Sequence, residues 1–527
     1  MLLVVSLDGA TFDLLDHWIP MGVLPNIAYL IKNGTRARLE STMPPITAPA
    51  WASFMTGKKP GKHGVFDFFV PGIFPLKLVT SRDIQSTFFW DYLQTAALKV
   101  GILNLPVTHP PRPVNGFLIP GLLSPDHGHT TWPPDLLDPY RSQLGPYRLT
   151  PPSLYWPGND KKYLSDLIHL TDLQIAYARK LLQDHQPELG IVHFLAPDIA
   201  QHKLWKHLDS DHPWHNPETA PELVSGIHTL FRHIDNAIGD FRDIAPEATI
   251  IILSDHGFGP LWRTVNLNNW FRQHGFLEIQ RNSSVRFRHW LARYPLFASL
   301  ARLLLRYTGS AELLRMEDID WEKTLAFSMG HCGQVYINRR GDFAHGSVAP
   351  NEVQAIMDRV VDCLNSLIDP DTGEKLISRI IPAQASDKGP LLRMGPDFHI
   401  IMDGYRTVAH PMFASDKNIL TEIDQGDSGY HRMEGIFIAH GPPIRCGITL
   451  EKARIIDLAP TILHLFDIPV PEDMDGQVLQ DALTPAFMTA HPIKYQSPLP
   501  FTETGDDIEN EDQSKIEERL RKLGYFG

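Results

Sequence analysis

The chain has 527 residues, of which 43% are hydrophobic and 21% are charged, an ordinary composition for a folded globular protein. This length is ample for a large α/β enzyme domain with an insertion. The formal net charge of −13 argues against a general nucleic-acid-binding protein, which needs a basic surface. Three scattered cysteines without C-x-x-C spacing exclude a thiolate metal site and a disulfide framework, and they suit a reducing compartment.

The beginning of the chain, MLLVVSLDG, contains an apolar run at residues 2–5 with no basic segment before it. This run is too short for a signal peptide and predicts a first β-strand instead. No other segment of the sequence reaches the uninterrupted apolar length of a membrane span. We therefore expect a cytoplasmic location.

Six short runs rich in Val, Ile and Leu are typical of strands that are buried on both faces of a parallel sheet. They begin at Leu2, Lys99, Leu189, Ala248, Asp397 and Gly435. Amphipathic patterns predict helices at residues 161–185, 221–241, 350–368 and 453–468. This alternation predicts a doubly wound α/β fold, in which ligands bind beyond the carboxyl ends of the strands.

Residues 41–57, STMPPITAPAWASFMTG, combine several hydroxyl side chains with three prolines and a final glycine. Pro49 suits the first turn of a short helix, and Gly57 suits the position just after its end. On this pattern alone, Thr47 is an ordinary N-cap residue of that helix. The N-terminus of a helix also favours a phosphate group, so a capping role and a chemical role are compatible at this position.

Acidic and histidine side chains follow three of the predicted strands, and they are Asp8, Asp198, His202, Asp255 and His256. Each one alone is also typical of a helix cap or a turn. However, burying an adjacent Asp and His at a strand end costs free energy unless something pairs them. Because all of them lie at carboxyl ends of strands, the pattern favours a metal site, and Asp with His suits Zn²⁺ or Mn²⁺.

The character of the sequence changes after the fourth predicted strand. We expect an α/β core formed by residues 1–269 and 395–475, an inserted cap at residues 270–394, and a linker with a charged helix at residues 476–527. In the last of these, Ile516, Leu520 and Leu523 fall on one helical face.

Residues 281–306, inside the expected cap, are basic and aromatic and have helical periodicity. We favour a helix that packs its apolar face on its own domain. Pro295 interrupts the segment, which weakens the case for a membrane-surface helix. The alternative is a weak contact with an anionic membrane surface.

Five motifs occur in a defined order along the chain: SLDG, PPITAPAWASFMTGKKPGKHGV, APDIAQH, SDHGFGP and GYHRMEGIFIAHGP. With them the chain resembles the alkaline phosphatase superfamily, and it is most similar to the type I phosphodiesterase / nucleotide pyrophosphatase branch. The resemblance implies an alkaline-phosphatase-like doubly wound sheet with helices on both faces. It also implies a hydrolase of phosphate esters or anhydrides that acts on a phosphate-ester or nucleotide small molecule.

The resemblance further implies two divalent metal ions, zinc in most relatives, with manganese as the alternative. Carried over by position, one ion would be held by Asp198, His202 and His431. The other ion would be held by Asp8, Asp255, His256 and the hydroxyl of Thr47. In this family pattern Thr47 is also the nucleophile and forms a phospho-threonine intermediate, which water then hydrolyses.

Two positions in this assignment stay open. His440 competes with His431 for the last ligand position, and we prefer His431 because it follows the glycine-containing loop DQGDSGY. An asparagine that usually contacts a phosphate oxygen near the nucleophile is missing, because Ala50 stands three residues after Thr47. Asn104, at the end of the second predicted strand, is the candidate replacement, and a simple turn residue is the alternative.

The missing asparagine leaves the choice between phosphodiesters and phosphomonoesters open. The alternatives in the same superfamily are therefore a phosphomonoesterase and a phosphomutase. A different class is a transferase that moves a head group at a membrane surface, for which the basic segment at residues 281–306 is the only support.

Overall fold

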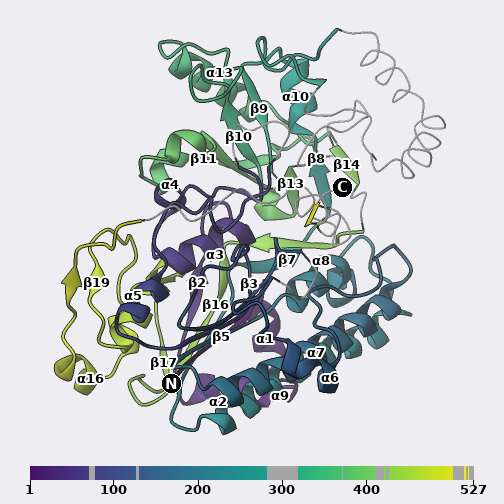
Figure 1. Ribbon diagram of the computed structural model, residues 1–527. Coiled ribbons are helices and arrows are strands. Elements are labelled where there is room, and N and C mark those ends of the chain that lie inside the picture. Colours follow the sequence, from purple (N-terminus) through teal and green to yellow (C-terminus); the bar gives the residue numbers. More distant parts are fainter. Residues whose placement is uncertain are drawn as a thin grey trace. The chain divides into compact units, whose positions relative to one another are not determined.

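The computed structural model describes residues 1–70, 77–125, 130–281, 318–330, 332–370, 372–409, 420–422 and 426–501, with Ile516, Glu517 and Leu520 (Figure 1). The chain forms two compact units. The first unit comprises Met1–Phe68, Leu78–Pro260 and Gln425–Phe526, and the second comprises Phe69–Lys77 and Leu261–Asp424. The second unit therefore encloses the expected insertion and extends beyond both of its ends.

The first unit is built on one sheet, which has nine strands within the described residues. Its path runs β17 (Ile448–Thr449), β2 (Thr35–Glu40), β16 (Glu434–His440), β6 (Thr249–Leu253), β1 (Leu2–Leu7), β5 (Leu189–Phe194), β3 (Val100–Leu105) and β4 (Gly116–Pro120). The ninth strand, β18 (Ala453–Arg454), pairs with β2. Strands β6, β1, β5, β3 and β4 are mutually parallel, and β1 lies between β6 and β5.

Two of the predicted parallel strands differ in the structure. Strand β16 belongs to this sheet but runs antiparallel to both β2 and β6. The strand predicted from Asp397 is β12 (Phe398–Met402), which belongs to the sheet of the second unit. Both errors have one physical cause: a strand that is buried on both faces gives a continuous apolar run whatever its direction and whichever sheet it joins.

Helices cover both faces of the sheet in the first unit (Figure 1). A β-carbon at Gly190 would contact Leu182 of α7 (Asp160–His185), whereas the ring of His193 contacts Trp51 of α3 (Thr47–Thr56). Successive residues of a strand point to opposite faces, so Gly190 and His193, three residues apart, do as well, and α7 and α3 lie on different sides of β5. The doubly wound α/β class that the sequence predicts is confirmed.

The helices form two groups. Helix α7 contacts α8 (Ala196–Leu208) and α9 (Ala220–Ile244), and α9 also contacts α2 (Pro25–Lys32). Helix α3 contacts α5 (Phe89–Thr95) and α15 (Leu458–Leu465). The other elements of the first unit are α1 (Phe12–Trp18), α4 (Pro60–His63), α6 (Asp138–Leu144), α16 (Pro485–Ala490), β7 (Gly257–Pro260), β15 (Gly429–Arg432), β19 (Val470–Pro471), β20 (Tyr495–Gln496), η4 (Ile455–Asp457) and η5 (Gln480–Ala482).

The second unit has its own mixed sheet. Its path runs β14 (Leu420–Glu422), β8 (Arg263–Val265), β13 (Thr407–Ala409), β12, β10 (Gln334–Ile337) and β9 (Ala326–Ser328), and β11 (Ile377–Pro382) pairs with β12. Its helices are α10 (Leu267–Gln273), α13 (Val353–Asn365), α14 (Ala383–Ser386), η2 (Leu392–Met394) and η3 (Asp403–Tyr405).

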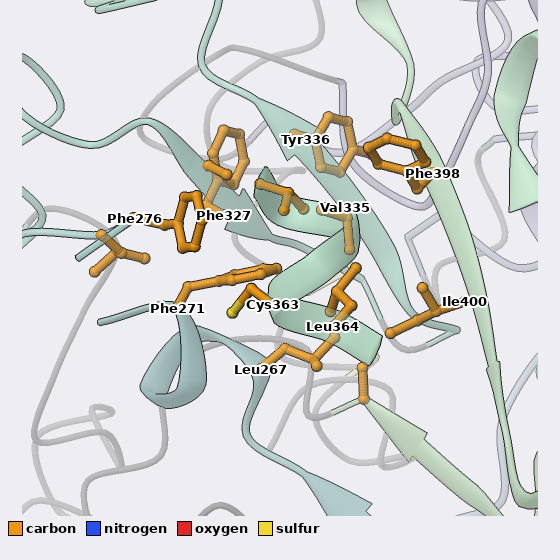
Figure 2. Packing of buried hydrophobic residues seen from close by; sticks show 14 of the residues in the cluster. Leu267, Phe271, Phe276, Phe327, Val335, Tyr336, Cys363, Leu364, Phe398 and Ile400 are labelled. Atoms are coloured by element: carbon orange, nitrogen blue, oxygen red, sulfur yellow. The ribbon is translucent and has the colours of Figure 1, made fainter. Parts of the chain in front are cut away.

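A separate hydrophobic core holds the second unit together. Figure 2 shows Leu364 of α13 between residues of α10, such as Leu267 and Phe271, and strand residues such as Val335 and Phe398. All five side chains are buried. The helix predicted at residues 350–368 thus exists, but it packs on this core and not on the main sheet.

Two expectations fall largely on residues outside the described part. Of the basic segment at residues 281–306, only Arg281 is described. Of the expected C-terminal helical face, Ile516 and Leu520 are described and buried, and Leu523 is not described. Where the structure describes helices, none of them is long and apolar enough to cross a membrane.

Candidate functional site

The candidate site forms where neighbouring parallel strands end. Strand β1 pairs with β5 on one side and with β6 on the other, so the carboxyl ends of all three strands lie at one edge of the sheet. Asp8 follows β1 directly, and Asp255 and His256 follow β6. Helix α8, which begins just after β5, presents Asp198 and His202 one turn apart. The sheet therefore gathers residues that are far apart in the sequence.

The first cluster, called here the Asp8 group, consists of Asp8, Asp255 and His256. One oxygen or nitrogen atom from each side chain lies within 4.8 Å of the others. His256 Nε2 lies 3.5 Å from Asp8 Oδ1 and 3.3 Å from Asp255 Oδ2. The hydroxyl of Thr47 lies 3.3 Å from the same Nε2 atom. All four side chains are buried, so the hydroxyl faces a cluster that is shielded from water.

The second cluster, called here the Asp198 group, consists of Asp198, His202 and His431. Asp198 Oδ1 lies 3.4 Å from His202 Nε2 and 3.3 Å from His431 Nε2. The two histidine Nε2 atoms are only 3.0 Å apart. The ring of His431 also stacks on that of His256 with 3.6 Å between the centroids, so the two groups are adjacent.

The orientation of the three histidines is fixed by backbone carbonyl groups. The Nδ1–H groups of His202, His256 and His431 donate to the carbonyl oxygens of Gly429, Gly257 and Pro45, at 3.1, 3.1 and 2.9 Å. In neutral rings, each Nε2 therefore carries a lone pair directed at carboxylate oxygens or at another lone pair. Lone pairs that converge in this way repel each other unless a cation lies between them. A histidine that donates its other N–H to a backbone carbonyl is the usual arrangement for a metal ligand.

The carboxylates of the Asp8 group point to the same conclusion. Asp8 Oδ1 and Asp255 Oδ2 are buried and accept no hydrogen bond from any described residue. Burial, followed by the charges of Asp255 and Asp198, raises the pKa of Asp8 well above its ordinary value. Burial and the charge of Asp198 raise the pKa of Asp255 to about 7. A divalent cation would compensate this negative charge, so the residues present fit a metal site.

Charge is balanced differently in the Asp198 group. Burial acts against ionisation of Asp198, but the neighbouring His202 and His431 hold its pKa well below the ordinary value. The carboxylate of Asp198 in turn raises the pKa of His202 in spite of burial. Burial lowers the pKa values of His256 and His431, which favours their neutral, ligating forms.

Thr47 occupies a different position in its helix from the one expected. Ile46 has an extended backbone and holds the N-cap position, so Thr47 is the first helical residue and its hydroxyl is directed at His256 and does not cap the helix. The expectation of an N-cap threonine was therefore wrong. Gly57 ends the helix with a φ of 66°, as predicted. The other hydroxyls of the segment bind elsewhere: that of Thr42 donates to Pro44 O, that of Thr56 to Ala52 O, and that of Ser53 lies 2.9 Å from His63 Nε2.

The structure distinguishes the two competing histidines. His431 lies on β15, where it pairs with Phe258 of β7 and joins the Asp198 group. His440 is the last residue of β16 and pairs with Ile250, near the amino end of the antiparallel neighbour β6. It therefore lies at the opposite edge of the sheet from both groups.

Asn104 is the next-to-last residue of β3, which is parallel to β5 and ends at the same edge of the sheet. Its backbone has a φ of 63°, a conformation that asparagine tolerates better than most residues. Its amide donates to His193 O at 3.4 Å, and its carbonyl oxygen accepts a hydrogen bond of 2.5 Å from the hydroxyl of Tyr147. A role of Asn104 in substrate binding stays a prediction.

Two residues next to the Asp8 group were missed in the sequence. His193 Nε2 lies 3.3 Å from Asp8 Oδ2, and the indole N–H of Trp51 donates to the same oxygen at 3.4 Å. Burial lowers the pKa of His193 to about 3, so this ring is neutral. These contacts engage Oδ2 and leave Oδ1 facing His256. The only signal in the sequence is a histidine within an otherwise apolar strand.

Comparison with known proteins identifies a family model that matches most of the chain. The family model for type I phosphodiesterase / nucleotide pyrophosphatase matches residues 2–409. This range contains Thr47, all three residues of the Asp8 group, Asp198 and His202, and His431 lies beyond it. No curated protein matches the chain.

Solved structures give more distant similarities. Human ectonucleotide pyrophosphatase/phosphodiesterase 5 is 14% identical, with 92% of this chain and 99% of that chain covered and a TM-score of 0.48. The murine protein has the same identity and TM-score, with 92% and 100% covered. An inactive form of the murine protein in complex with AMP gives 14% identity, a TM-score of 0.48, and 92% and 99% covered. At this identity and TM-score the solved structures do not establish family membership, which the match to the family model shows.

Proposed function

Because this chain belongs to the type I phosphodiesterase / nucleotide pyrophosphatase family, a family of metal-dependent hydrolases of phosphate ester and anhydride bonds, we propose that it cleaves its substrate with Thr47 as the nucleophile. One observation carries this proposal. The buried hydroxyl of Thr47 lies 3.3 Å from His256 Nε2, at the edge of a cluster of unpaired carboxylate oxygens. A structural threonine at the start of a helix has no reason to face such a cluster.

The two groups would hold two divalent ions, zinc with manganese as the alternative. Asp198, His202 and His431 would hold one ion, and Asp8, Asp255, His256 and Thr47 the other. When bound, such ions neutralise charge on the phosphoryl oxygens and on the attacking and leaving oxygens of an in-line displacement. Apart from the Thr47 hydroxyl, each group would supply three protein ligands, the number that is typical of catalytic zinc sites.

The residues of the chain would act in two half-reactions. In the first, the Thr47 hydroxyl gives up its proton and its oxygen forms a bond to phosphorus, while the bond to the leaving oxygen breaks and that oxygen takes up a proton. This gives phospho-threonine, which keeps the second ester group when the substrate is a diester, and an alcohol or phosphate product. The start of helix α3, with its free N–H groups and positive dipole end, favours the phosphoryl group at this place. In the second, water attacks phosphorus, the bond to the Thr47 oxygen breaks, that oxygen regains a proton, and phosphate or a phosphate monoester is released.

The substrate class follows from the family, and we propose a nucleotide or another small phosphate ester. Ala50 offers no amide to a phosphate oxygen, so both phosphodiesters and phosphomonoesters belong in the test. The head-group transferase has no support among the described residues, since its basic segment lies almost entirely outside them. The cytoplasmic location stays a prediction.

The decisive experiment compares the wild type with Thr47→Ala and Thr47→Ser. We expect zinc- or manganese-dependent hydrolysis by the wild type, assayed with bis-(p-nitrophenyl) phosphate, p-nitrophenyl phosphate and nucleotides. Loss of a nucleophile should lower kcat by roughly a thousandfold or more, and the serine variant should keep part of the activity because it keeps a hydroxyl. Mass spectrometry of the acid-quenched wild type should find one adduct on the peptide that contains Thr47: a phosphoryl group from a monoester, or a phosphoryl group that keeps its second ester from a diester. Equal turnover by Thr47→Ala would refute the assignment.

A further inference from the structure

The Asp198 group depends on the docking of one segment onto helix α8. The backbone N–H of Ser428 donates to the carbonyl oxygen of His202 at 2.6 Å, and the backbone N–H of Lys206 donates to the Ser428 hydroxyl at 3.1 Å. The ring of His202 donates to the carbonyl oxygen of Gly429. The same segment continues into β15, where His431 follows only two residues after Gly429. The docking of this segment therefore determines the position of His431.

The approach of the segment to the helix is unusually close. A β-carbon at Gly429 would lie 2.5 Å from the carbonyl oxygen of Gln201 and 2.9 Å from Trp205 Cβ. Only glycine allows this backbone-to-helix contact without displacement. A small shift of the segment would therefore be transmitted directly to β15 and its histidine.

A buried ion pair closes the same contact. Lys203 of α8 binds the carboxylate of Asp427, and the two side chains are only 3% and 17% exposed. The ammonium group also lies 5.4 Å from the ring centroid of Tyr155. Two charges removed from water in this way stabilise each other, and removal of either partner leaves an uncompensated buried charge. Lys203 directly follows His202, and Asp427 lies four residues before His431.

We propose that Lys203 and Asp427 are a positioning pair for the Asp198 group: they hold the Asp427–Gly429 segment on α8 so that His431 meets Asp198 and His202. This inference rests on the proposed function, from which it takes a divalent metal ion as the ligand of the Asp198 group. The pair has no counterpart in the Asp8 group, whose ligands follow strands of one sheet directly. Its loss should therefore weaken one metal site and spare the other.

Positioning can be separated from a simple charge effect. If only charge mattered, Asp427→Asn would leave a lysine cation beside the site and weaken metal binding, whereas Lys203→Met would leave a carboxylate and strengthen it. If the pair positions the segment, both substitutions weaken binding. The opposite directions expected from charge alone make the two variants a direct test.

The experiment uses the full chain with Zn²⁺ alone as the probe. Native mass spectrometry counts the bound ions, and competition with a chelating indicator gives the affinities. We expect two ions in the wild type. In Asp427→Asn and in Lys203→Met we expect one ion at wild-type affinity and a second one bound 10- to 100-fold more weakly, the usual cost of removing a partner behind a metal ligand. Lys203→Arg keeps the charge and a hydrogen-bond donor, so it should keep most of the wild-type affinity for the second ion.

A matched control is Lys206→Met, on the same helix. Lys206 pairs with Asp160 of α7 at 3.4 Å, and its side chain, 12% exposed, binds outside the Asp427–Gly429 segment. This variant should keep two ions at wild-type affinity even if its unfolding free energy falls. Circular dichroism verifies that every variant is folded, and Asp427→Asn keeps the size of the side chain in order to preserve the fold.

The outcomes distinguish this inference from the proposed function. Two ions at wild-type affinity in both Asp427→Asn and Lys203→Met would overturn the inference, and so would opposite shifts of affinity in the two variants. A wild-type chain that binds two ions but hydrolyses no phosphate ester contradicts the proposed function and leaves the positioning role intact. A wild-type chain that binds no zinc overturns both.

Discussion

The Asp8 group and the Asp198 group lie side by side, yet the chain builds them by different means. The Asp8 group takes its residues from the ends of β1 and β6, two directly paired strands. The Asp198 group takes two residues from α8 and one from β15, which needs the docked Asp427–Gly429 segment to reach them. A group on sheet ends is positioned by the sheet itself, whereas a group that includes a loop-borne ligand depends on additional contacts.

The two groups also differ in charge. The Asp8 group has two carboxylates and one histidine, and the pKa values of both acids are raised by burial and by neighbouring negative charge. The Asp198 group has one carboxylate and two histidines, which hold the pKa of Asp198 low. Without a cation, the first group is therefore destabilising, and the second is already partly compensated. Four predictions test this contrast, beginning with the largest effect.

Asp255→Ala and Asp198→Ala should each remove one ion, from the group that contains the substituted residue. Lewis-acid stabilisation of the reacting oxygens is worth several kcal/mol, so kcat should fall by roughly a thousandfold in each variant. Ion counts by native mass spectrometry and turnover of p-nitrophenyl esters measure the two effects. Asp172→Ala, which removes an acid that pairs with His233 on the helices α7 and α9, is the control and should change neither quantity. Loss of both ions in one variant would show that the groups are not independent.

In the metal-free protein, substitutions in the two groups should change the free energy of unfolding in opposite directions. Asp255→Asn removes a repulsive buried charge and should raise the free energy of unfolding, whereas Asp198→Asn breaks contacts with His202 and His431 and should lower it, each by about 1–3 kcal/mol. Urea denaturation with excess chelator measures both changes. Effects of the same sign would contradict the charge contrast.

The same experiment has a pH dependence. The folded-state pKa of Asp255, about 7, lies above its value in the unfolded chain, so the folded chain binds more protons in the interval between them. The contribution of Asp255 to the stability of the metal-free protein should therefore rise as the pH falls from about 7 towards about 4. The difference in unfolding free energy between the wild type and Asp255→Asn, measured at each pH, isolates this contribution.

Gly9 lies beside both groups, and its substitution tests the packing between them. Its N–H donates to Asp255 Oδ1 at 3.3 Å, and a β-carbon there would lie 2.8 Å from Phe258 and 3.4 Å from Asp198. Gly22 has a similar positive φ, 72° against 65°, but open space around it. Gly9→Ala should therefore lower the unfolding free energy by about 1–3 kcal/mol more than Gly22→Ala, because only the former overpacks its surroundings. Equal losses in urea denaturation would show that backbone strain alone is responsible.

Much of the site could be read from local sequence. The residues Asp8, Asp255 and His256 come soon after apolar runs, and Asp198 and His202 lie in the helix that follows another such run. A parallel sheet brings the ends of these runs together. Thr47 could be chosen among its neighbouring hydroxyls because the other candidates lie before the prolines or deeper in the helix. Its exact place in the helix could not, because the backbone of Ile46 decides which residue begins the first turn.

Other features depended on pairing between distant segments. The sequence does not distinguish a parallel from an antiparallel buried strand, so the direction of β16 and the sheet that β12 joins could not be predicted. Neither could the contacts of His193 and Trp51 with Asp8, which form between a strand and a helix whose relative placement no local pattern encodes.

The α/β class, the strand ends that carry acids and histidines, and the segment that carries Thr47 follow from local sequence, because each depends on the periodicity and chemistry of consecutive residues. The choice of His431 over His440 for the Asp198 group, and the pairing of Lys203 with Asp427, appear only in the folded chain. The reason is physical: these choices depend on strand direction and on the packing of a loop against a helix, which are interactions between segments more than 200 residues apart.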